Sequence, residues 1–154
     1  MKQGGLSLIE LLVVIALFGL FSVAGMSFTD GWVDSNRVMA GENMMVQAYG
    51  IAKATALRNE HGKTGDNAAA ALCIANNVIS VREATTAAAA SCSTTLAWSA
   101  TVNARLSITA DNTAVTCACL NNQGLLTTTG CNSCLATNAI VLSSGATNVQ
   151  TSLL

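Results

Sequence analysis

The sequence lacks proline altogether and is poor in charged and aromatic residues. Charged residues make up 10% of the 154 positions, against about 25% in an average soluble domain. The formal net charge is −1, and the basic residues beyond the N-terminal apolar run are interleaved with acidic ones. Because a nucleic-acid-binding surface is usually clearly basic, this balance makes a nucleic-acid partner an unlikely prediction.

Motifs that carry catalytic chemistry are also scarce. His61 is the only histidine, and it lies in a polar segment next to a glycine. The sequence contains no G-x-S-x-G motif and no glycine-rich phosphate-binding loop. We therefore expect a protein that is not an enzyme, requires no cofactor and holds His61 toward solvent.

Hydrophobic residues make up 51% of the chain and gather near the N-terminus. The segment from Leu11 to Phe28 has no charge, and at about 1.5 Å per residue its helix would cross most of a bilayer core. It is too long for a typical signal-peptide core, and no A-x-A-like cleavage site follows it. Lys2 before the run and Asp30 and Asp34 after it favour an N-terminus inside the cell and a body outside.

One carboxylate, that of Glu10, stands at the start of this apolar run, five residues after a Gly-Gly pair. A charge at the start of a membrane segment costs a few kcal/mol on insertion scales, so such residues are candidates for a function. The alternative is an interfacial acid that only extends toward lipid headgroups.

The rest of the chain divides into a helical and a β-rich part. Residues 6 to about 60 predict one long helix, amphipathic from about residue 33 to 60. Residues 29–32, TDGW, are a candidate point for a kink or a new helix cap. The apolar residues that recur at helical spacing in the amphipathic half are Val38, Met45, Tyr49, Ala52 and Ala56.

Residues from about 68 to 154 predict short strands and loops. AALCIANNVISV predicts a hairpin around Asn76-Asn77, and TAVTCACLNNQGLLTTT predicts another around NNQG. ARLSITA and NAIVLSS are further strand candidates, and the low-complexity tract 84–95 predicts a surface loop. Four to six short strands with no helix between them predict an α+β fold, in which a small antiparallel sheet packs on the amphipathic half-helix.

The stretch LSLIELLVVIALFGL resembles the class III signal of type IV pilins and type II secretion pseudopilins. In that family prepilin peptidase removes a leader that ends in glycine, and a glutamate is the fifth residue of the mature chain. The resemblance implies cleavage after Gly5, an N-methylated new N-terminus at Leu6, and an assembly role for Glu10. In a filament core its carboxylate would pair with the amine of a neighbouring subunit, because an unpaired buried charge is costly.

Two departures accompany this resemblance. The first mature residue is Leu6, where the family usually has phenylalanine, and the family's proline midway along the helix is missing. Gly19 and Gly25 are then the candidate soft points. A looser similarity, in NRVMAGENMMVQAYGIAKATALRN, links the chain to the H-type minor pseudopilins and the FimT/FimU minor pilins.

The resemblance also implies an organisation and a set of partners. Residues 1–5 would be the leader, 6–30 a membrane-spanning and filament-core helix, and 31–154 a periplasmic or extracellular head. The implied function is a minor pilin of a type IV pilus-like filament. The alternatives are an H-type pseudopilin of a type II secretion system and a DNA-binding minor pilin of natural transformation.

The implied partners are other pilin subunits, prepilin peptidase, an inner-membrane assembly platform and, before assembly, membrane lipid. The implied location is the bacterial inner membrane, followed by a cell-surface pilus or a periplasmic pseudopilus.

An even number of cysteines in an exported head favours disulfide bonds. Cys117-x-Cys119 and Cys131-x-x-Cys134 also approach the spacing of a zinc tetrathiolate, and free or intermolecular thiols are the third alternative. The exported context favours disulfides and no metal. The disulfide candidates are Cys73, Cys92, Cys117, Cys119, Cys131 and Cys134.

The spacing limits the pairing of these cysteines without fixing it. Cys117 and Cys119 would share one face of a strand and cannot easily bond each other, so each should reach another segment. Cys131 and Cys134 are the candidate partners, and the remaining two cysteines would form the third bridge.

Overall fold

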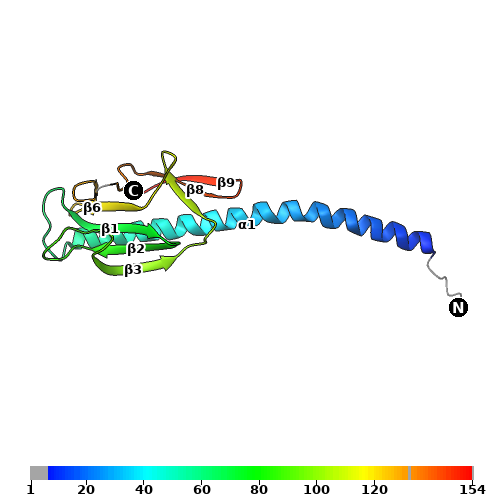
Figure 1. Ribbon diagram of the computed structural model, residues 1–154, viewed down its shortest axis with the longest axis horizontal. Helices are drawn as coiled ribbons and strands as arrows, with labels where there is room; N and C mark the ends of the chain where they lie inside the picture. The colour runs from blue at the N-terminus through cyan, green and yellow to red at the C-terminus, as the bar shows by residue number, and fades with distance from the viewer. Residues whose placement is uncertain (1–6, 132, 154) are drawn as a thin grey trace.

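The computed structural model describes residues 7–131 and 133–153. Over these residues one helix, α1 (Leu8–Arg58), precedes nine strands. Figure 1 shows the C-terminal part of α1 lying against the strands, whereas its N-terminal part extends away from them alone. We call residues 8–23 the stalk, and the part of the chain from residue 33 onward the head.

α1 is a single uninterrupted helix of 51 residues, about 75 Å long at 1.5 Å per residue. The expected new cap at residues 29–32 is therefore wrong. No atom lies within 4 Å of the position that a Cβ of Gly31 would take, so the helix surface is open there.

The helix ends at Arg58, close to the predicted end. Asn59 caps it in the left-handed conformation, with φ 44°. Its side chain holds the following loop, because Oδ1 accepts from the Lys63 N–H and Nδ2 donates to the Lys63 carbonyl, both at 2.7 Å.

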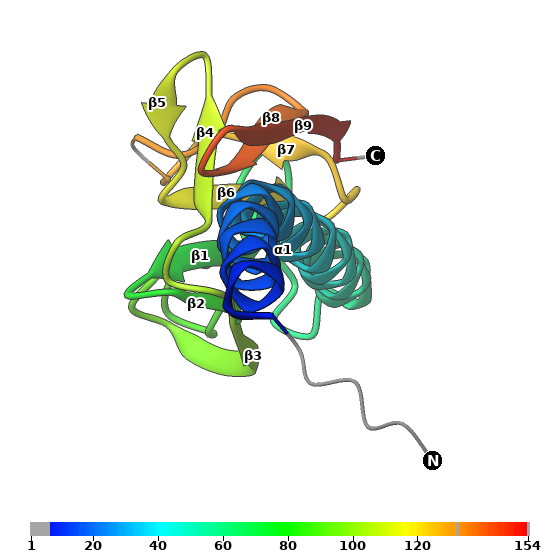
Figure 2. The ribbon, with the colours of Figure 1, turned by 90° about the vertical axis from the view of Figure 1, so that its right-hand side faces the viewer.

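The strands form two antiparallel sheets. The five-stranded sheet has the order β3-β2-β1-β6-β7, and the four-stranded sheet has the order β5-β4-β8-β9. In Figure 2, which looks along the molecule, the two sheets lie against different sides of α1. The strands are β1 (Ala68–Ala75), β2 (Val78–Glu83), β3 (Thr95–Thr101), β4 (Ser107–Ala110), β5 (Thr113–Ala114), β6 (Cys117–Asn121), β7 (Leu126–Thr127), β8 (Ala139–Ser144) and β9 (Thr147–Ser152).

The predicted α+β architecture is confirmed, but the number of strands and sheets is not. Both predicted hairpins form: Asn76 and Asn77 turn between β1 and β2 with φ 50° and 61°, and Gly124 turns between β6 and β7 with φ 72°. The prediction of one small sheet is wrong, because the strands divide into two sheets. The number of strands also exceeds the predicted four to six, in part because β3 and β9 form in segments rich in Thr, Ser and Ala or Asn. Both are edge strands, where one backbone side stays open to solvent and polar residues are tolerated.

The main core lies between α1 and both sheets. The predicted apolar face of the helix is confirmed, since Val38, Met45, Ala52 and Ala56 are fully buried and Tyr49 is nearly so. Opposite them lie buried residues of both sheets, Leu72, Ile79, Leu120, Ile140 and Leu142. Small alanines on the helix let the strands approach closely.

A second buried cluster covers the other face of the five-stranded sheet. There the covering elements are loops: Ala84 donates to the Ala69 carbonyl at 3.1 Å, and Ala90 to the Ala68 carbonyl at 2.8 Å. The expectation of a surface loop over 84–95 is therefore wrong in part, because Ala84 and Ala90 are buried. Their small side chains fit against a strand that is itself rich in alanine.

Candidate functional site

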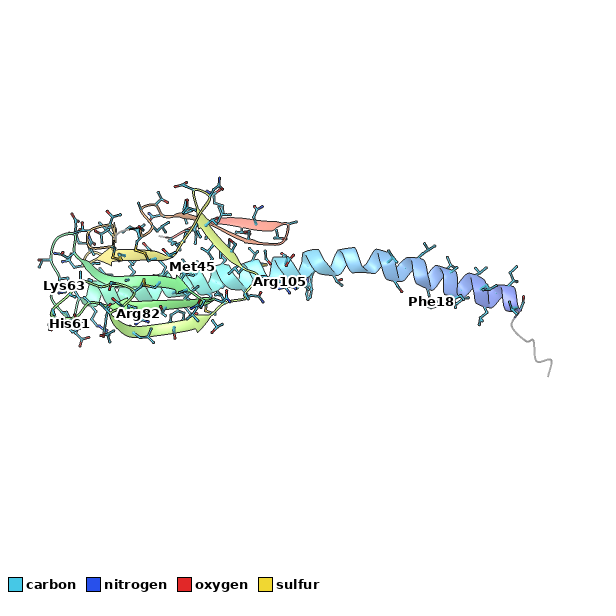
Figure 3. The ribbon with its side chains drawn as sticks, viewed as in Figure 1. Phe18, Met45, His61, Lys63, Arg82 and Arg105 are labelled. Atoms are coloured by element: carbon cyan, nitrogen blue, oxygen red, sulfur yellow. A yellow bond between two sulfur atoms is a disulfide. The ribbon has the colours of Figure 1, made fainter. Side chains whose placement is uncertain are left out.

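The stalk presents an apolar surface that nothing in the described part of the chain covers. Its large apolar side chains, from Leu8 to Val23, are between 46% and 77% exposed. Figure 3 shows the contrast along one helix: Phe18 projects from the stalk, whereas Met45 lies where the helix meets the strands. A helix that is apolar on all sides is normally buried in a larger structure, so this surface requires a partner outside the chain.

Glu10 lies in the first turn of α1, where it forms a capping box with Ser7. The Ser7 N–H donates to Glu10 Oε2 at 2.8 Å, and the Ile9 N–H donates to Ser7 Oγ at 3.3 Å. A carboxylate at this position also interacts favourably with the helix dipole. Glu10 therefore has a local role in starting the helix, and its second carboxylate oxygen could accept a further donor.

Two of the predicted processing residues, Gly5 and Leu6, lie outside the described residues. The structure places Ser7 immediately beyond them as the N-cap, in an extended conformation with φ −70° and ψ 143°. The helix thus begins at Leu8, three positions after Gly5.

A further exposed apolar side chain lies at the base of the head. Trp32 is 70% exposed and borders a hollow of about 360 Å³ between α1 and the end of β3. The Leu106 side chain closes part of this region by filling the space where a Cβ of Gly41 would lie. The hollow is lined by Trp32, Val33, Asn36, Arg37, Ala40, Gly41, Met44, Thr101, Val102 and Asn103.

Asp34 ties the β8–β9 hairpin to the helix at this same level. Its Oδ1 accepts from Ser144 Oγ at 2.8 Å and from Arg37 Nη1 at 2.7 Å. The hydrogen bond from Ser144 and then the one from Arg37 hold the pKa of the Asp34 carboxyl below its ordinary value of 3.8. Gly145, with φ 56°, lets the turn pass close to this carboxylate.

All six cysteines are paired in three disulfides, which staple the loops that cover the five-stranded sheet. Cys117 bonds to Cys134 and Cys119 to Cys131, so each cysteine of β6 reaches the other segment, as expected. The third bridge, Cys73–Cys92, ties β1 to the loop after β2, as the sequence suggested. Closing loops of 12 to 19 residues stabilises a domain by about 3 kcal/mol each in the chain-entropy description.

A zinc site would have no free cysteine ligand in this oxidised chain, because every cysteine sulfur is in a disulfide. In the described part of the chain, the one group of histidine, cysteine or acidic side chains close enough to share an ion is Cys119, Cys131 and Cys134. His61 lies half-buried in the loop after α1, away from that group, and the expectation that it faces solvent holds only in part.

Comparison with known protein families finds one match. Residues 1–26 fit the model described as the prokaryotic N-terminal methylation motif. The motif supports the type IV pilin-like family. For a pilin-like protein, this signal implies processing by prepilin peptidase and assembly with other pilins. No curated protein and no solved structure is significantly similar to the chain.

The pilin-type signal indicates a membrane-associated or surface-pilus location. Across residues 7–131 and 133–153, no helix combines the length and the hydropathy needed to cross a membrane. The expected membrane-spanning role of residues 6–30 is therefore not confirmed.

Two features of the site were not anticipated from the sequence. The pairing of Ser7 with Glu10 could have been predicted from the sequence, because S-x-x-E before an apolar run is the pattern of a capping box. The contact between Asp34 and Ser144 had no such signal, since it joins residues 110 positions apart.

Proposed function

We propose that this chain is a structural subunit, a minor pilin, of a type IV pilus-like filament. It would assemble through the stalk after cleavage between Gly5 and Leu6. The observation that supports this most is the methylation motif over residues 1–26, followed by a helix that leaves its apolar side chains uncovered.

The driving force for assembly would be burial of the stalk between neighbouring helices. For a stalk exposed to water, burial of one large apolar side chain contributes about 1.5–3 kcal/mol, and the stalk carries a run of them. For a stalk that starts in lipid, the gain comes from close packing between helices instead. Such contacts are non-directional and do not by themselves fix how far one helix is displaced along another. A buried ion pair between Glu10 and the amine of an adjacent Leu6 would select the axial position, because misregister would leave a charge without a partner.

The capping box makes a sharper test possible than removal of the side chain. Glu10→Gln keeps an amide oxygen that can accept from the Ser7 N–H, since glutamine also serves in a capping box, but it removes the charge. Ser7→Ala disrupts the cap and keeps the charge. We expect Glu10→Gln to be cleaved normally but not incorporated into filaments, and Ser7→Ala to be cleaved and incorporated.

The measurement is the amount of each variant in purified filaments relative to the amount in cells, together with the mass of its N-terminus. If Glu10→Gln assembles as well as the unaltered chain while Ser7→Ala fails, Glu10 acts only by starting the helix and the ion-pair mechanism is wrong. Filaments whose subunits still begin at Met1 would also contradict the proposal.

A further inference from the structure

Four cysteine sulfurs gather beneath one end of the five-stranded sheet. Cys117 and Cys119 extend from the same face of β6, and the turn that carries Cys131 and Cys134 lies over them. The Sγ atoms of Cys119 and Cys134, which are not bonded to each other, are 3.9 Å apart. The sulfurs of Cys119, Cys131 and Cys134 all lie within 4.8 Å of one another, and that of Cys117 is bonded to Cys134.

The arrangement of three of these sulfurs, those of Cys119, Cys131 and Cys134, is close to the one that a tetrahedral metal ion requires, and the Cys117 sulfur would have to move closer to them. With Zn–S bonds of about 2.3 Å, the sulfurs of a tetrathiolate lie about 3.8 Å apart. The unbonded pair Cys119 and Cys134 already has this separation. Opening the two disulfides would let the sulfurs within each bridge move apart toward the same distance.

We propose that, when both bridges are reduced, Cys117, Cys119, Cys131 and Cys134 hold one thiophilic divalent cation such as Zn²⁺. A dithiol reductant supplies two electrons and two protons to each bridge and leaves as a disulfide, so two equivalents yield four cysteine thiols. Binding of the cation then releases up to four protons to solvent. Cys73 and Cys92 are not part of this site, because they are bonded to each other and not to a member of the close group, whereas Cys117 is bonded to Cys134.

The burial of the four cysteines differs in a way that leaves the site accessible. Cys117, Cys119 and Cys131 are buried, whereas Cys134 is half-buried and gives the ion an approach from solvent. Thr116 Oγ1 lies 3.8 Å from Cys117 Sγ and can donate to a thiolate. The Ala90 carbonyl lies 3.4 Å from Cys131 Sγ and disfavours a thiolate there, so the loop that carries Ala90 must move slightly when the ion binds.

The test is a cobalt titration of the full chain in detergent, reduced without oxygen by a water-soluble phosphine, which becomes its oxide. We expect the visible spectrum of a tetrahedral cobalt thiolate, saturating at one ion per chain and removed by Zn²⁺. The oxidised chain should give no such spectrum.

Two double variants separate the site from the remaining bridge. Cys119→Ser with Cys134→Ser should weaken binding by more than about 100-fold, since even loss of a residue that only orients a ligand costs 10–100-fold. Cys73→Ser with Cys92→Ser should bind cobalt like the unaltered chain.

A reduced chain that gives no cobalt thiolate spectrum would overturn the proposal, whether or not its head stays folded by circular dichroism. Equal binding by the Cys119 and Cys134 double variant would also overturn it. Unchanged affinity in denaturant would show that the fold does not build the site.

Discussion

The two halves of α1 belong to one uninterrupted helix, yet their apolar residues have opposite surroundings. In the stalk the side chains of Leu8 to Val23 are largely exposed, whereas in the head Val38, Met45 and Ala52 are fully buried. The head half places its apolar residues on one face and meets two sheets of the same chain. The stalk is apolar on all sides, so its partner must come from another molecule. The comparison shows that one helix can pack within its own chain at one end and leave an uncovered apolar surface at the other.

The largest effect that follows from the contrast between stalk and head is expected for a charge placed in the stalk. Phe18→Lys should abolish incorporation into filaments, because an unpaired ammonium would be buried among apolar helices. Since Phe18 contributes nothing to the head, the thermal unfolding temperature of the head should not change. Filament yield, subunit level in cells and unfolding by circular dichroism test this. Phe18→Leu is the matched control and should assemble. Normal assembly of the lysine variant would mean that the stalk is not a packing surface.

A second pair of variants sharpens the comparison within the head half of the helix. Met45→Ala should reduce the free energy of unfolding by about 2–5 kcal/mol, because it leaves a cavity in the core. Met39→Ala, at a position that is 56% exposed, should change it by no more than about 0.5 kcal/mol. Denaturant unfolding of both variants provides the test. Equal effects would contradict the assignment of the buried helix face.

The stability of the contact between α1 and the β8–β9 hairpin should be sensitive to one added methyl group. Gly145→Ala forces a side chain into the left-handed region and against the Asp34 carboxylate. Gly62→Ala meets the same backbone restriction at φ 62° but has open space around it. We expect Gly145→Ala to destabilise the head by about 1–3 kcal/mol more than Gly62→Ala does, from overpacking alone. A difference near zero would show that the β8–β9 hairpin can move away from Asp34 without loss of stability.

The smallest expected effect is a dependence of head stability on acid. Because the folded-state pKa of Asp34 is lowered, first by the Ser144 hydrogen bond and then by Arg37, its contribution is present above the unfolded pKa of about 3.8. It is lost as the pH falls below that value through the folded-state pKa. Unfolding of the unaltered chain and of Asp34→Asn between neutral and acidic pH should converge at the acidic end. Parallel curves would contradict this role for Asp34.

The sequence predicted local features well, because they depend on residues close together in the chain. The spacing of apolar residues around Met45 predicts a helix, and the pair Asn76-Asn77 predicts a turn. Each of these signals lies within a few positions of the chain. The start of the helix at Ser7 could have been predicted from the S-x-x-E pattern in the same way.

The features that escaped prediction depend on contacts across the fold. The division into two sheets is set by which strand finds which neighbour, and the polar segment of β9 gives little periodic signal of its own. The tract 84–95 looked like a surface loop because it is of low complexity and shows neither a helical nor a strand period. Two of its residues, Ala84 and Ala90, are nevertheless buried, because the Cys73–Cys92 disulfide and the hydrogen bond from Ala90 to the Ala68 carbonyl attach the tract to β1.

The absence of a break in α1 has a consequence for the geometry of any assembly. A rigid rod with 3.6 residues per turn couples length to rotation, so inserting one residue between stalk and head would swing the head by about 100° around the axis while lengthening the subunit by only about 1.5 Å. Which side of the head faces a neighbour is therefore encoded in the number of residues that separate Val23 from Val38.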